Sequence, residues 1–178
     1  MTRIADEAGV TRGALQHHFD DRRALMLSVV EDGYEELTSE LNSLSRMDGT
    51  VRDRVDAIID GMLRCYATSH ALAAFEVVLA LRDDDEFPGR HLSTIAPFAA
   101  ALDKQWLELF ADTGAATETI QAARQVARAS VLGLILSNVV GLGPIDPNTV
   151  NGLKESVLHL LSRSVDLQNF GFTQGGAT

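Results

Sequence analysis

The amino-acid sequence predicts an all-α fold, and three observations support this. Apolar residues recur at steps of three and four through most of the chain, which is the spacing of one face of an α-helix. Residues that cap or stop helices separate these stretches. No stretch alternates apolar and polar residues between hairpin turns, so no strand is predicted. The 178 residues are enough for one domain or for two small ones.

The first predicted elements are two short helices between Thr2 and Phe19. Gly9 is expected to end the first helix, because glycine takes a left-handed conformation at little steric cost. Thr11 is a good N-cap for the second helix, since its hydroxyl accepts a hydrogen bond from an unpaired backbone N–H. Two small apolar faces around a glycine turn are typical of a helix-turn-helix. These faces consist of Ile4, Ala5, Ala8, Ala14, Leu15 and Phe19.

The exposed side of the second helix offers polar groups that suit nucleic acid. Arg12 can pair with guanine or phosphate, Gln16 with adenine and His17 with phosphate. Gly13 lies beside them, and the first turn of the helix offers free N–H groups to an anion. From these residues alone, a short solvated surface helix is an equally good interpretation.

The run ADEAGVTRGALQHHF, from Ala5 to Phe19, is followed by DRRAL. Together they resemble the helix-turn-helix signature of the TetR family of transcriptional regulators, and nearly every position matches. Gln16 departs from the pattern, because an aromatic residue is usual there, and so do Asp20 and Asp21, where Pro-Ser is common. The resemblance covers only the start of the chain and implies a DNA-binding regulator. The DNA contacts that it implies are Thr11, Arg12, Gly13, Gln16, His17 and, holding a phosphate, Arg22.

In the TetR family a further helix precedes this segment and packs under the two reading helices. This chain begins at Met1, where that helix would already have ended. The resemblance therefore predicts an incomplete DNA-binding domain with a linking helix at 1–46, through either a displaced start or a real loss. A small domain that lacks one of its helices is expected to be only marginally stable. The alternative function is a TetR-derived dimeric ligand-binding or interaction protein that no longer binds DNA.

Six longer helices are predicted beyond this head. A capping box of Thr50 and Asp53 begins the second of them, and Asp146 followed by proline begins the last. A turn at 46–49 marks the start of a ligand-binding and dimerisation domain at 47–178. The predicted helices span residues 22–45, 51–69, 70–82, 93–112, 118–142 and 147–166.

The predicted helix at 70–82 is apolar on nearly all sides, so it is expected to be buried. Glu76 would then be a buried carboxylate, which needs either an arginine partner or a ligand cavity. Residues 83–89 are predicted to form an acidic loop. Pro97 is expected in the first turn of the next helix, where proline is tolerated.

The last two predicted helices carry more apolar surface than one small domain covers by itself. This predicts a protein partner, and a symmetric dimer is the commonest one. In the TetR family these two helices form the dimer interface. The resemblance therefore implies a homodimer that brings two reading helices to a palindromic operator. The polar segment at 169–178 is predicted to be disordered.

Composition limits the function classes further. A formal net charge of −10 argues against a protein that coats nucleic acid without sequence preference. No long apolar run predicts a membrane span, no signal peptide is visible, and the single cysteine suits a reducing cytosol. A cytoplasmic location is therefore expected. No catalytic, phosphate-binding or metal-binding motif is visible, so neither an enzyme nor a cofactor is predicted.

The resemblance also implies a cavity for a small hydrophobic molecule whose binding releases a repressor from DNA. Apolar and aromatic walls with few polar groups suit such a ligand. Plain core packing is the alternative for each wall residue, and Cys65 is expected to be a small buried hydrophobe rather than a reactive thiol. The candidate ligand-binding residues are Met62, Cys65, Tyr66, Phe75, Phe98, Leu102, Trp106 and Asn138.

Overall fold

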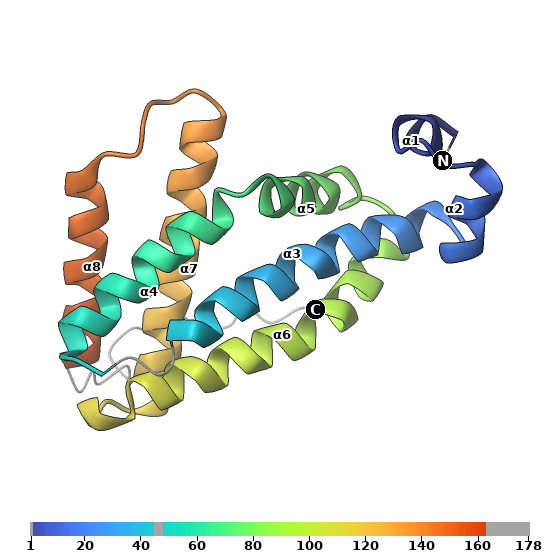
Figure 1. Cartoon of the computed structure of the whole chain (residues 1–178). Helices are drawn as coiled ribbons and strands as arrows, with labels where there is room; N and C mark the ends of the chain where they lie inside the picture. The colour runs from blue at the N-terminus through green and yellow to red at the C-terminus, as the bar shows by residue number, and fades with distance from the viewer. Residues whose placement is uncertain (1, 45–47, 163–178) are drawn as a thin grey trace, which may run out of the picture.

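Figure 1 shows the computed structural model of the chain, which describes residues 2–44 and 48–162. Over these residues the chain forms eight α-helices, one short 3-10 helix and no strand. The prediction of an all-α fold is confirmed. The elements are α1 (Thr2–Glu7), α2 (Arg12–His18), α3 (Arg22–Leu44), α4 (Val51–Tyr66), α5 (Ser69–Ala80), α6 (Phe87–Leu109), η1 (Ala111–Thr113), α7 (Thr117–Val139) and α8 (Pro147–Ser162).

The long helix α3 connects the two ends of the molecule. Helices α1 and α2 lie at its N-terminal end, and α4, α5 and α6 all pack against it (Figure 1). Helices α7 and α8 pack together at the far side of the body, where both contact α4 and α7 also contacts α6. We call α1 and α2 the head and α4 to α8 the body.

The predicted caps explain where several helices begin and end. Gly9 has φ +66°, the left-handed conformation that lets the chain turn from α1 into α2. The Thr11 side chain accepts a hydrogen bond from the N–H of Ala14 at 3.1 Å, and Asp21 caps α3 through the N–H of Ala24. Both halves of the capping box at Thr50 are formed.

The prediction for the start of the fourth long helix is wrong. Helix α6 begins at Phe87 rather than near residue 93, so Pro88 lies in its first turn and Pro97 in its interior. Asp84 explains the earlier start, because its Oδ1 accepts the N–H groups of Glu86 and Phe87. The side chain of Phe87 is fully buried in a cluster with α3 and α5, which holds this first turn in place.

The expectation that the helix at 70–82 is buried is also wrong. In α5 only Ala74 is buried, and Leu79 is 45% exposed. Glu76 lies on the exposed side and therefore needs neither an arginine partner nor a cavity. The helix rests with one face on α3, where the absence of a side chain at Gly33 allows close approach: a Cβ there would lie 3.1 Å from the Cβ of Ala74.

Three separate groups of buried residues form the core. The largest joins α3, α4, α6, α7 and α8 around Trp106 and Phe110, whose ring centroids are 5.3 Å apart. A second contains Leu27, Val30, Ala74 and Phe87 between α3, α5 and α6. The third joins the head to α3 and contains only Ala5, Leu15 and Leu25.

Parts of the sequence predictions fall outside the described residues. These are residues 46 and 47 of the turn predicted at 46–49, the last residues of the helices predicted at 22–45 and 147–166, and the tail at 169–178. Among the helices that are described, none is both long enough and apolar enough to cross a membrane.

Candidate functional site

Helix α2 of the head packs through its apolar side and presents its polar side to solvent. Leu15 of α2 packs with Ala5 of α1 and Leu25 of α3, and Phe19 and Met26 cover this cluster. The helix α2 is therefore held against the first turns of α3. The six predicted DNA contacts are all exposed residues: Thr11, Arg12, Gly13, Gln16, His17 and Arg22.

Two adjacent arginines at the start of α3 have different surroundings. Arg23 is paired with Asp84 at 2.9 Å and with Glu86 at 3.3 Å, so it ties α3 to the segment between α5 and α6. Asp21 lies 3.6 Å from Arg90 and adds a second link to α6. Arg22, in contrast, forms no ion pair with the residues described here. Its cation is therefore available to a phosphate, which is the chemistry that DNA contacts require.

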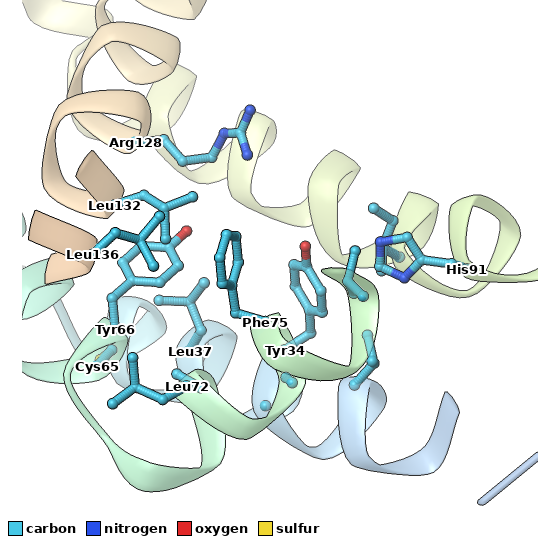
Figure 2. Close-up of a pocket in the computed structure, with 16 residues that line it drawn as sticks. Tyr34, Leu37, Cys65, Tyr66, Leu72, Phe75, His91, Arg128, Leu132 and Leu136 are labelled. Atoms are coloured by element: carbon cyan, nitrogen blue, oxygen red, sulfur yellow. The ribbon is translucent and has the colours of Figure 1, made fainter. Parts of the chain in front are cut away.

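A cavity of about 250 Å³ lies in the body, between α3, α5 and the facing ends of α4, α6 and α7. Figure 2 shows it as a layer of aromatic and aliphatic side chains with Arg128 at one side and His91 at the other end. Apolar walls with a few polar groups are typical of a site for a small organic molecule. The lining residues are Val30, Gly33, Tyr34, Leu37, Cys65, Tyr66, Ala71, Leu72, Ala74, Phe75, Val78, His91, Ile95, Arg128, Leu132 and Leu136.

The structure brings some of the predicted ligand residues to this cavity and not others. Cys65, Tyr66 and Phe75 line it, and Phe98 stacks on the lining Tyr34 with ring centroids 5.9 Å apart. Asn138 lies at the end of α7, where its side chain donates a hydrogen bond to a loop carbonyl. The remaining three are buried in the main core outside the lining: Met62, Leu102 and Trp106.

The sequence predictions missed three polar residues of the lining, Tyr34, His91 and Arg128. Tyr34 shares a helical face with Val30 and Leu37, so its periodicity could have indicated it. His91 precedes residue 93, where the sequence predicted that this helix begins. Arg128 lies on a stretch of alternating small and polar residues, and no local signal indicates that it faces a cavity.

The titratable groups of the cavity are held in their neutral forms by burial. Burial raises the pKa of Tyr66 to about 12 and also raises that of Tyr34, so both phenols stay protonated. Burial raises the pKa of the Cys65 thiol to about 11, and lowers the pKa of His91, whose Nδ1 is buried without a hydrogen-bond partner among the described residues. The described residues contain no cluster of three metal-ligating side chains.

A thiol that stays protonated is a poor nucleophile, so the buried Cys65 behaves as the small hydrophobe that the sequence predicts. Neutral phenols, a neutral imidazole and an inert thiol leave Arg128 as the only formal charge in the described lining of the cavity. The arrangement is suited to holding a small molecule.

Comparison with known proteins identifies the head. Residues 1–29 match the family described as bacterial regulatory proteins, tetR family. The comparison with curated proteins finds no match. The matched residues comprise α1, α2 and the first turns of α3, which are the elements that present Arg12, Gln16 and Arg22. Residues 1–29 are thus similar to the helix-turn-helix of that family, which supports a role as a DNA-binding transcriptional regulator.

Proposed function

We propose that this protein is a cytoplasmic, homodimeric repressor that binds a palindromic operator and leaves it when a small hydrophobic molecule enters the cavity. In this proposal residues 1–46 read DNA, with Thr11, Arg12, Gly13, Gln16, His17 and Arg22 at the duplex. Residues 47–178 bind the ligand and the second subunit. The match to the tetR family supports the DNA-reading role.

The observation that carries the ligand response is the path of α3. Val30, Tyr34 and Leu37 of this helix line the cavity, and Leu25, near its start, packs against Leu15 of the reading helix. A molecule that displaces the middle of α3 therefore acts on the same rigid element that holds α2. Such a ligand binds one conformation of the protein better than the other. It therefore shifts the equilibrium between two positions of the head.

Apolar surface on the last helices supports the dimer. Val126 and Val139 of α7 are 40% and 53% exposed, and Val140 directly after it is 67% exposed. Gly133, on the same helix, has no described atom within 4 Å of the point where a Cβ would be. This open, apolar side of α7 suits close packing against a second copy, which is the commonest way for such a surface to be covered.

DNA binding is tested by fluorescence anisotropy with duplexes from upstream of the gene, at several salt concentrations. We expect sequence-preferring binding that weakens as salt increases, because phosphate contacts release counterions. Arg12→Ala should weaken binding by about 1–3 kcal/mol, the value of a lost base contact. Arg82→Ala removes an exposed arginine outside the head and is the matched control, for which affinity should not change. Sequence-indifferent or absent binding would favour the alternative, a dimeric ligand-binding or interaction protein derived from the family.

A further inference from the structure

We propose that the cavity binds a hydrophobic carboxylate, with its anionic group at Arg128 and its apolar part among the side chains of α3, α5 and α6. The inference rests on the proposed ligand response and names the chemical class of the ligand. Three features support it: an arginine without an acidic partner, a lining without acidic residues, and two phenol groups that face the same side.

The first feature is the contrast between two arginines on α7. Arg124 is buried, and its Nε lies 2.5 Å from Oδ1 of Asp103, so its charge is neutralised within the fold. Arg128 lies one helical turn later, is exposed to solvent and borders the cavity. No carboxylate of the described residues lies within ion-pair distance of it, and its one hydrogen bond is to Gln125 at 3.4 Å. Arg128 therefore offers guanidinium donors to a group from outside the chain.

The second feature is the lining itself. None of the lining residues is an aspartate or a glutamate, and most are aliphatic or aromatic. Where a cation borders an apolar cavity, an anion gains a charge-assisted hydrogen bond and a second cation is repelled. A molecule with one anionic end and an apolar remainder satisfies both the arginine and the walls. A neutral apolar molecule would satisfy only the walls.

The third feature is the orientation of Tyr34 and Tyr66. Figure 2 shows their hydroxyl groups pointing to the side of the cavity on which Arg128 lies, with Phe75 between them. Neither hydroxyl has a hydrogen-bond partner among the described residues. Burial raises the pKa of each phenol, and the nearby charge of Arg128 opposes part of that rise. Protonated phenols are hydrogen-bond donors, so they complement a carboxylate at this position.

The cavity also limits the size of the ligand. A volume of about 250 Å³ lies just below the usual range for ligand sites, about 300–1,000 Å³. This favours a compact aliphatic or aryl-aliphatic acid over a large conjugate. We therefore choose as probes octanoate with octanol and octylamine, and phenylbutanoate with phenylbutanol, because each set keeps the apolar part constant and changes only the end group.

The test is isothermal titration calorimetry of the full chain with each probe. In at least one set the carboxylate should bind about tenfold more tightly than its alcohol, the equivalent of one good charged contact, and octylamine should bind most weakly. Arg128→Met should remove this preference while leaving alcohol binding within about twofold. Arg128→Lys should retain part of it, because the charge remains. Arg82→Met is the control for a change in net charge and should alter nothing.

Several results would overturn the proposal. These are equal binding of carboxylate and alcohol in the unaltered protein, an unchanged preference in Arg128→Met, or no binding of either carboxylate. DNA release, measured in parallel, separates this inference from the proposed function. If an alcohol releases DNA as well as its carboxylate does, the ligand-responsive regulator stands and the anion preference is wrong. If a carboxylate binds at Arg128 but no duplex is bound, the ligand class stands and the regulator is wrong.

Discussion

The head and the body of this protein rest on very different amounts of buried apolar surface. In the described residues the largest core cluster contains nineteen buried side chains from α3, α4, α6, α7 and α8. The head has two, Ala5 and Leu15, and two of its other apolar side chains, Ile4 and Val10, are 36% and 44% exposed. Buried apolar area is the main source of stability, so the head depends on its attachment to α3 rather than on a core of its own.

That attachment has an apolar part and a charged part. Leu25 of α3 completes the small cluster with Ala5 and Leu15. The Arg23–Asp84 pair then ties the same end of α3 to the body. We therefore expect substitutions in the body to lower the stability of the whole fold. Substitutions in the head should first weaken DNA binding.

The largest effect is expected from Trp106→Ala. Trp106 is 1% exposed at the centre of the main core and contacts Phe110. Removing a fully buried large aromatic side chain costs about 3–5 kcal/mol, through lost burial and the cavity left behind. Urea denaturation followed by circular dichroism should show this loss. Leu92→Ala, at a side chain that is 67% exposed, is the control and should change stability by less than about 0.5 kcal/mol. A similar small change for Trp106→Ala would contradict the assignment of the core.

A smaller and more local effect is expected from Leu15→Ala. Leu15 is the only buried residue of α2, so its truncation should cost about 2 kcal/mol, near the low end for such changes, because few neighbours surround it. Hydrogen exchange should accelerate in α1 and α2 while amides of α4 and α7 keep their protection, and operator binding should be lost. Equal acceleration in head and body would show that the two regions unfold together. The head would then not be the less stable region.

The smallest effect concerns the charged attachment. The Asp84 carboxylate accepts hydrogen bonds from Arg23 and from the N–H of Phe87, which lowers its pKa from 3.8 to about 2. Because the pKa is lower in the folded state, this contribution to stability is present above pH 3.8 and is lost as the pH falls towards 2. NMR titration of the carboxyl carbon should show the low pKa, and Arg23→Gln should raise it. An unchanged pKa in that variant would mean that the pair is not formed in solution.

The sequence was most informative where the structure depends on local interactions. Thr11, Gly9 and the capping box at Thr50 act within a few residues of themselves, so their roles could be predicted. The start of α6 could not, because Asp84 caps it from a position that resembles an ordinary acidic loop. The exposure of Glu76 likewise depends on which face of α5 meets α3, and a helix that is apolar on all sides does not reveal this.

The candidate cavity shows the same limit. Tyr66 and Phe75 could be chosen because they are aromatic residues on helices that surround the family's cavity. Trp106 and Met62 are also large apolar residues on such helices but lie in the main core. Distinguishing them requires the relative rotation of the helices, which is a property of the tertiary packing. Arg128 could be proposed as a ligand contact only when the packing showed that Arg124, and not Arg128, has Asp103 as its partner.

The length of α3 has a mechanical consequence. Its 23 residues span about 34 Å as one unbroken helix, and the cavity lies near its middle, so a tilt of about 10° there moves its start by about 3 Å. A displacement of that size is comparable to the spacing between successive base pairs along a duplex, about 3.4 Å. In the proposed mechanism, a ligand no larger than a short fatty acid would therefore move the reading helix α2 along the duplex by nearly one base pair.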